Sequence, residues 1–279
     1  MRRDRKKQME NEIPEGDGEE IIEEIKNEIF SEGADIKVFN LSWLVLPLGF
    51  AVLYEWMFRK FMPVIEDAEI SLLAYEVILA VLVISFTLLA RKTFLAGWKM
   101  PKGFSWLLVV GPVWLGIISP VGMAIENAAG DVGAVLIWGA ISLLVAINEE
   151  TLFRGFALRG LMKSFRPLTA VILSSIAFGL LHLVNLWEGG SPILIGAQVI
   201  SATGVGAIMA ALTLRSGSIL PAILIHFLVD IVGLTALGGF EEALQSVEFA
   251  PSLVITGLVF FAWGLFWSWR AERAGKIKY

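Results

Sequence analysis

Long runs of apolar residues, separated by short polar segments, occupy the sequence from about residue 41 onward. Because about 20 apolar residues cross the hydrocarbon core of a bilayer as a helix, each long run predicts one membrane span. The pattern predicts eight such helices, at residues 41–58, 71–90, 104–126, 133–158, 170–187, 192–214, 217–237 and 251–269. The sixth is rich in Gly and Ala, which predicts close packing against its neighbours. We therefore expect an all-α, polytopic membrane protein whose spans form one domain over residues 41–269.

The overall composition agrees with a protein that lives in a bilayer. Apolar residues make up 56% of the 279-residue chain, charged residues make up 18%, and the mean hydropathy is +0.73. A water-soluble domain of this length would be far less apolar. The chain contains no Cys, which excludes disulfides, thiolate nucleophiles and thiolate metal ligands. Any catalysis must therefore use oxygen and imidazole groups.

The distribution of Lys and Arg predicts the orientation of the spans. With the N-terminus inside, only Arg59 and Lys60 of the 22 Lys and Arg fall on the outer side. Short cytoplasmic loops carry an excess of these residues, so we expect both termini to be cytoplasmic. Residues 1–40 then form a charged cytoplasmic tail, and residues 270–279 form a shorter one. The first tail contains GEEIIEEIKNEIF, whose four Ile share one helical face and predict a short amphipathic helix.

Ionisable side chains within membrane spans are the candidates for chemistry. Each costs roughly 2.5–3.5 kcal/mol at mid-helix, and such residues are retained mainly where they have a use. One of them, Glu76, lies in the second span. Three later helices carry a larger group: Glu149, Glu150 and Arg154, then His182, then His226 and Asp230. Each helix places its group roughly 12–18 Å from the expected cytoplasmic end, so one shared site toward that side is possible.

The spacing of these residues favours a hydrolase. Residues four apart lie on one helix face, and three such pairs occur: Glu150 with Arg154, His226 with Asp230, and Phe178 with His182. A carboxylate close to imidazoles in a low-dielectric cavity is suited to activating water. A covalent intermediate is less favoured, because no Ser or Thr lies in a nucleophile sequence such as G-x-S-x-G.

Three short motifs carry a resemblance to a known family. In chain order, EETLFR at 149–154 fits E-E-x-x-x-R, FGLLH at 178–182 fits F-x-x-x-H, and HFLVD at 226–230 fits H-x-x-x-N/D. Together they contain both His of the chain. The set resembles the intramembrane glutamic endopeptidases of the CAAX-protease and bacteriocin-processing (CPBP) family, which includes the Ras-converting enzymes. The resemblance implies a protease that hydrolyses a peptide bond of a membrane-associated protein.

The resemblance also implies roles for individual residues. Glu149 and His182 would activate the attacking water, while His226 with Asp230 would line the oxyanion side. Three further residues would support them: Glu150, Arg154 and Phe178. The best-known members have Asn at the position of Asp230, and an ionised Asp cannot donate a hydrogen bond to an oxyanion. Asp230 would then either orient His226, which we favour, or remain protonated.

We expect no cofactor, no bound metal ion and no nucleic-acid partner. The expected partners are the lipid bilayer and a peptide or protein substrate. In the eukaryotic relatives that substrate is a prenylated CAAX protein, but nothing in this sequence identifies a prenyl-binding element. A prokaryotic source would place the chain in the cell membrane.

Other interpretations remain open from the residues alone. A zinc-dependent membrane protease could take its ligands from Glu149, His182, His226 and Asp230, although the H-E-x-x-H pattern is missing. A non-proteolytic immunity or partner-binding protein could share the fold. A transporter also places charges at mid-depth, but these charges trace no path to the outer face. Polar groups that only join helices contribute about 0.6 kcal/mol each, which is less than their insertion penalty.

Overall fold

The chain divides into two compact units, Met1–Ser42 and Trp43–Tyr279, and the helices described below belong to the second. The computed structural model describes residues 44, 47, 49, 52, 68–89, 97–103, 107, 109–275 and 277. Within these ranges the regular structure is entirely helical, which confirms the predicted all-α class. The amphipathic helix predicted for the first tail, and all but four residues of the span predicted at 41–58, lie outside the described residues.

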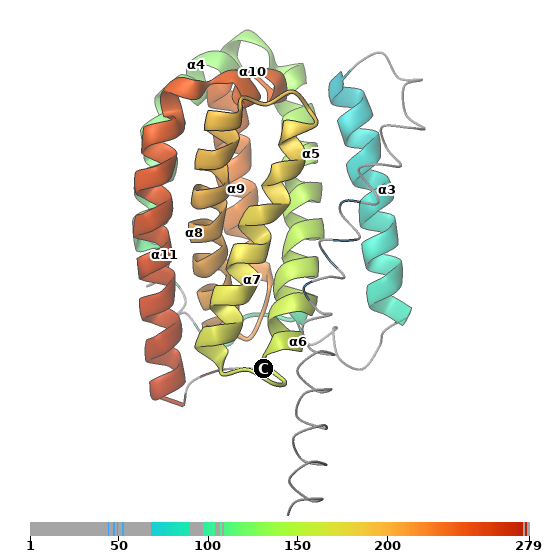
Figure 1. The fold of residues 1–279 in the computed structure, drawn as a ribbon. Coiled ribbons are helices and arrows are strands. Elements are labelled where there is room, and N and C mark those ends of the chain that lie inside the picture. Colours follow the sequence, from blue (N-terminus) through green and yellow to red (C-terminus); the bar gives the residue numbers. More distant parts are fainter. Residues whose placement is uncertain are drawn as a thin grey trace, which may run out of the picture. The chain divides into compact units, whose positions relative to one another are not determined.

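Helices of the second unit run side by side (Figure 1). In chain order they are α3 (Ala68–Leu89), α4 (Gly111–Gly130), α5 (Val132–Glu150), the π-helix η3 (Thr151–Leu158), α6 (Arg159–Leu161), α7 (Pro167–Leu181), the 3₁₀ helix η4 (His182–Leu186), α8 (Pro192–Ser216), α9 (Leu220–Leu237), α10 (Phe240–Gln245), the 3₁₀ helix η5 (Val247–Phe249) and α11 (Ala250–Arg273). The helix α8 packs between α7 and α11, whereas α9 packs against α4 and α5. The helix α3 packs against α5.

Six helical stretches among the described residues are long and apolar enough to cross a membrane. They are Glu69–Leu88, Val132–Leu161, Pro167–Leu186, Pro192–Ser216, Leu220–Leu237 and Val247–Arg273, and they match six of the eight predicted spans. The chain is therefore a polytopic membrane protein, but a count of eight is not confirmed. The span predicted at 104–126 corresponds to α4, which is helical but not among the six. Pro120 lies inside α4, and the polar pair Glu126 and Asn127 lies near its end.

Proline and glycine set the limits of the spans. Pro167, Pro192 and Pro221 lie in the first turns of α7, α8 and α9. Proline suits this position, because its fixed φ is helical and the first helical N–H groups have no partner within the helix. Gly217 and Gly238 cap the C-terminal ends of α8 and α9, and their φ angles of 72° and 88° lie in the left-handed region that glycine adopts without strain.

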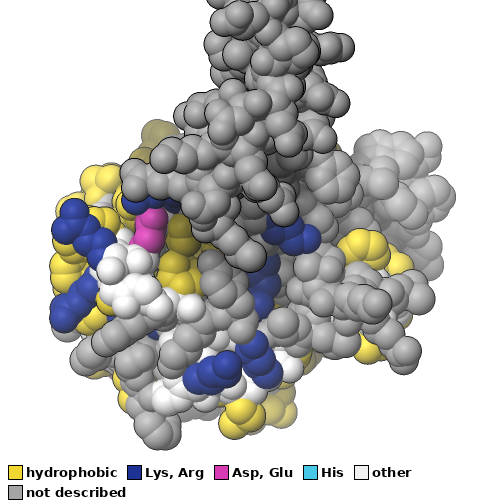
Figure 2. Space-filling view, turned by 90° about the horizontal axis from the view of Figure 1, so that it is seen from below, with side chains coloured by type: hydrophobic (Ala, Val, Ile, Leu, Met, Phe, Trp, Pro, Cys, Tyr) yellow, Lys and Arg dark blue, Asp and Glu magenta, His cyan; other side chains and the backbone are white. Residues whose placement is uncertain are grey.

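One end of the unit gathers basic side chains. Arg159 and Arg215 lie in the last turns of α6 and α8, Arg273 lies at the end of α11, and Arg166 precedes α7. Figure 2 views this face and shows its Lys and Arg side chains. Such an excess is expected on a cytoplasmic side. The predicted orientation, with both termini inside, is compatible with this arrangement and stays a prediction.

The close packing predicted for the sixth span is present between α8 and α11. A Cβ atom built at Gly204 of α8 would overlap the carbonyl oxygen of Gly257 in α11, and one built at Gly264 would overlap the backbone of Ala207. Membrane helices use such small residues to bring their backbones together. The glycines therefore allow α11 to lie directly on α8, which in turn holds α7.

We expect Gly204→Ala to lower the free energy of unfolding by about 1–3 kcal/mol, because the added methyl group must displace the backbone of α11. Denaturant-induced unfolding of the purified protein in detergent measures the change. Gly196→Ala is the matched control on the same helix, since a Cβ atom there would meet nothing within 4 Å. Equal stability of the two variants would contradict the close-packing role of Gly204.

Candidate active site

The candidate site lies where α5, α7 and α9 approach one another. Glu149 and Glu150 are the last two residues of α5, and Arg154 follows within η3. His182 comes directly after α7, and His226 lies in the middle of α9. The sequence pattern did not predict that the span becomes a π-helix directly after Glu150. Short π-helical segments occur frequently at functional sites.

His226 is the centre of the cluster. Its Nδ1 lies 2.9 Å from Glu150 Oε1, and its Nε2 lies 3.3 Å from Asp230 Oδ2 and 3.6 Å from Glu149 Oε2. The His226 side chain is only 6% exposed. A neutral imidazole has one N–H and an imidazolium has two. With carboxylates facing both ring nitrogens, the ring donates in both directions only as the imidazolium.

Glu150 and Arg154 form a fully buried ion pair. Arg154 Nη1 lies 3.0 Å from Glu150 Oε1, and the two side chains are 1% and 0% exposed. The other terminal nitrogen of Arg154, Nη2, donates to the backbone oxygen of Gly206 in α8 at 3.1 Å. The guanidinium also lies 4.3 Å from the ring centroid of Phe178. Arg154 thus joins η3 to α7 and α8 while it compensates the carboxylate that holds His226.

Phe178 lies between the two His rings. Its ring centroid is 5.3 Å from that of His182 and 5.9 Å from that of His226, and both pairs are edge-to-face. His182 Nδ1 lies 3.1 Å from the backbone oxygen of Phe178. A carbonyl oxygen only accepts hydrogen bonds, so Nδ1 carries the proton and Nε2 of a neutral His182 keeps its lone pair. His182 is therefore held in the tautomer that can accept a proton at Nε2.

The structure thus brings the residues of the three motifs together. All three pairs at a spacing of four are in contact, and His226 of α9 also contacts Glu149 and Glu150 of α5. The imidazole that Glu149 contacts is that of His226, whereas His182 joins the cluster through Phe178. Glu149 Oε2 is buried and has no hydrogen-bond partner among the described residues.

A second buried polar pair, which sequence reasoning did not find, adjoins the site. Asn148 Nδ2 donates to Glu76 Oε2 at 2.7 Å and to the backbone oxygen of Glu76 at 3.2 Å. Asn148 is fully buried and immediately precedes Glu149. Glu76 stood out in the sequence as a charge within a span, but its partner did not, because a neutral Asn is less conspicuous there. The pair fixes α3 against α5 next to the site.

The carboxylates and imidazoles do not converge on a common point in the way metal ligands do. Among the described residues, no group of three or more His, Asp or Glu has an arrangement that could hold a metal ion. The carboxylates of Glu149, Glu150 and Asp230 approach the ring of His226 itself.

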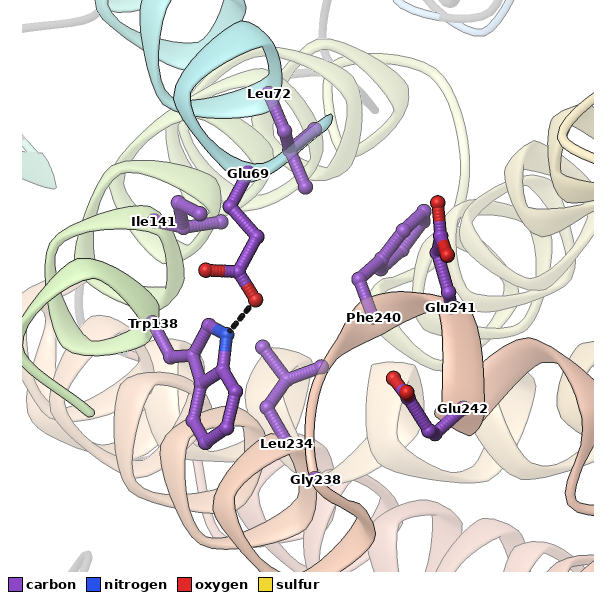
Figure 3. Close-up of a pocket in the computed structure, with 9 residues that line it drawn as sticks. All are labelled: Glu69, Leu72, Trp138, Ile141, Leu234, Gly238, Phe240, Glu241 and Glu242. Atoms are coloured by element: carbon purple, nitrogen blue, oxygen red, sulfur yellow. Dashed lines mark hydrogen bonds between the residues drawn. The ribbon is translucent and has the colours of Figure 1, made fainter. Parts of the chain in front are cut away.

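A cavity of about 280 Å³ lies elsewhere, between α3, α5, α9 and α10 (Figure 3). Its lining consists of Glu69, Leu72, Trp138, Ile141, Leu234, Gly238, Phe240, Glu241 and Glu242. Within it, Trp138 Nε1 donates to Glu69 Oε1 at 2.6 Å. Trp138 and Glu149 are roughly 17 Å apart along their helix, so the cavity is separate from the candidate site.

Comparison with models of known protein families gives a match over part of the chain. Residues 131–232 match the model of a family described as Rce1-like, type II CAAX prenyl endopeptidase. The matched range runs from the start of α5 into α9 and contains all three motifs. Comparisons with curated proteins and with solved structures found no match.

Proposed function

We propose that this chain, whose residues 131–232 match the model of Rce1-like type II CAAX prenyl endopeptidases, is an intramembrane glutamic endopeptidase. The observation that carries the proposal is the unpartnered oxygen of Glu149. A buried carboxylate oxygen without a donor is unfavourable by about 1–3 kcal/mol or more. Glu149 Oε2 is in that state, 3.6 Å from His226 Nε2 and within the range that matches a peptidase family model. A water molecule that donates to this oxygen satisfies it and is placed for attack.

The proposed reaction uses side chains of the chain itself. Glu149 takes a proton from water while the water oxygen forms a bond to the scissile carbonyl carbon. His182 assists this proton transfer by accepting a hydrogen bond from the same water through the free lone pair on Nε2. The imidazolium of His226, fixed by Glu150 and Asp230, stabilises the negative charge that develops on the carbonyl oxygen. When the C–N bond breaks, the proton taken from water passes to the leaving nitrogen, so the products are an acid and an amine.

The location of the site favours a substrate that is itself membrane-bound. The acidic and imidazole groups lie within helices that are long and apolar enough to span a bilayer, and such groups are retained there mainly for function. We propose a site toward the cytoplasmic side, near the end that carries the basic side chains. The family description names a CAAX prenyl endopeptidase, so a prenylated C-terminal peptide is the first substrate class to test.

We expect the purified protein, reconstituted in liposomes, to cleave a quenched fluorescent peptide that ends in a farnesylated CAAX sequence. The same peptide without the farnesyl group is the control. Cleavage of both at equal rates would contradict recognition of the prenyl group. Failure to cleave either peptide, together with identical membrane peptidomes for wild type and Glu149→Gln, would contradict the endopeptidase and favour a non-proteolytic partner-binding protein.

We expect Asp230→Asn to lower kcat by roughly tenfold or more, because the amide supplies no negative charge to hold His226 as the imidazolium. Initial rates on one peptide substrate measure the change. Glu248→Gln, which neutralises an exposed carboxylate on η5, is the matched control and should behave as wild type. Wild-type kcat in Asp230→Asn would instead indicate that a protonated Asp230 donates to the oxyanion, since Asn can donate equally well.

A further inference from the structure

Gly206 of α8 lies against the buried guanidinium of Arg154. Its backbone oxygen accepts the hydrogen bond from Arg154 Nη2 at 3.1 Å. A Cβ atom built at Gly206 would lie 3.3 Å from Arg154 Nη2, 3.3 Å from Phe178 Cδ1 and 3.2 Å from the Cα atom of Ser175. Real Cβ atoms seldom approach other atoms this closely. Because Gly206 has no side chain, the guanidinium of Arg154 and the ring of Phe178 can lie directly on the backbone of α8.

The two groups that lie against Gly206 are the ones that hold the candidate site together. Arg154 pairs with Glu150, and the same oxygen of Glu150 that Arg154 approaches also faces His226 Nδ1. Phe178 contacts both His rings. Two routes of contact therefore connect Gly206 to His226, one through Arg154 and Glu150 and one through Phe178, along which a small shift can pass. Cores transmit such shifts because they are closely packed.

The other glycines of α8 have different surroundings. A Cβ atom at Gly196 would meet nothing within 4 Å, and one at Gly204 would meet the backbone of α11. Among these three glycines, Gly206 alone faces side chains of the candidate site.

We propose that Gly206 is a positioning residue, whose missing side chain sets the guanidinium of Arg154 and thereby fixes Glu150 against His226. Its effect on turnover rests on the proposed endopeptidase function, whereas its effect on the His226 ring does not. The proposal therefore predicts two separate observables, one kinetic and one spectroscopic.

The spectroscopic test uses ¹⁵N-labelled histidine in the full chain in detergent micelles. The chain has only two His, so the spectrum of His182→Gln assigns the ring signals. We expect Gly206→Ala to shift the Nδ1 resonance of His226, because Glu150 moves relative to the ring. The control Gly196→Ala should leave this resonance at its wild-type position.

The kinetic test compares the same variants on one peptide substrate. We expect Gly206→Ala to lower kcat about tenfold with little change in KM, since small displacements of reacting groups reduce the chemical step more than binding. Gly196→Ala should keep wild-type values. A wild-type resonance in Gly206→Ala, or a shifted resonance with wild-type kcat, would overturn the positioning role. If wild type cleaves no substrate, the endopeptidase proposal fails, and the resonance still decides whether Gly206 sets His226.

A second variant keeps the test valid if Gly206→Ala does not fold. Arg154→Lys retains the positive charge beside Glu150 but removes the nitrogen that donates to the Gly206 oxygen. We expect it to shift the His226 Nδ1 resonance in the same direction as Gly206→Ala. An unshifted resonance would overturn the proposal, because Arg154 would then not transmit the position of Gly206.

Discussion

Replacing Glu149 with Gln is expected to abolish peptide hydrolysis while the chain remains folded. Gln has the size of Glu but cannot take a proton from water, and loss of a general base typically lowers turnover by about 10²–10⁴-fold. Packing should survive, because the nearest charged partner of Glu149 Oε2 is 3.6 Å away and that oxygen makes no hydrogen bond to the described residues. Initial rates in liposomes and the unfolding midpoint in detergent measure the two effects.

Two results would contradict this assignment of Glu149. Turnover at the wild-type rate in Glu149→Gln would remove the residue from the reaction. Loss of wild-type activity in phenanthroline, with recovery on addition of Zn²⁺, would assign water activation to a metal ion. The exposed-carboxylate variant Glu248→Gln serves again as the control for loss of a negative charge.

Replacing Arg154 with Met is expected to lower the free energy of unfolding by roughly 3–5 kcal/mol, the effect of removing one partner of a buried ion pair. Glu150 would be left at 0% exposure, and among the described residues only His226 would remain to compensate its charge. The variant also loses the hydrogen bond to Gly206 and the contact with the Phe178 ring. Unfolding in detergent as a function of denaturant concentration measures the loss.

A matched control for Arg154→Met is Arg166→Met. Arg166 pairs with Glu272 at 3.0 Å, but the Arg166 side chain is 81% exposed. Water screens such a pair, so little or no change in stability is expected. A similar loss of stability in both variants would show that burial of the Arg154–Glu150 pair has no special importance.

The sequence predicts contacts within a helix better than contacts between helices. The pairs Glu150–Arg154 and His226–Asp230 followed from the spacing of four and are present. The contacts of Asn148 with Glu76 and of Arg154 with Gly206 did not follow from the sequence. Spans in a bilayer are apolar on the faces toward lipid as well as toward protein, so hydrophobic periodicity does not reveal how each helix is rotated about its axis.

The ends of some helices were predicted well from the sequence, and the ends of others were not. The apolar runs predicted the bounds of α8 and α9 within three residues, at 192–214 and 217–237 against Pro192–Ser216 and Leu220–Leu237. The helix α4 begins at Gly111, later than the predicted 104. It continues to Gly130, beyond the predicted end at 126. The π-helix η3 has no sequence signal that we can name. Seven of its eight residues are buried, including Arg154, so it is surrounded by tertiary contacts that the local sequence does not reveal.

The π-helix also divides its span into two segments. Each segment turns its buried side chains in its own direction about the helix axis. Above it, α5 directs Glu149 and Glu150 toward His226. Within and below it, Leu158 and Leu161 pack into a core with residues of α7 and α8. In an α-helix, deletion of one residue turns everything beyond it by about 100°. Here a one-residue deletion within 151–158 would convert the π-helix to an α-helix and would leave Glu149 and Glu150 facing α9. Related chains can therefore differ by one residue in this segment and keep the same site.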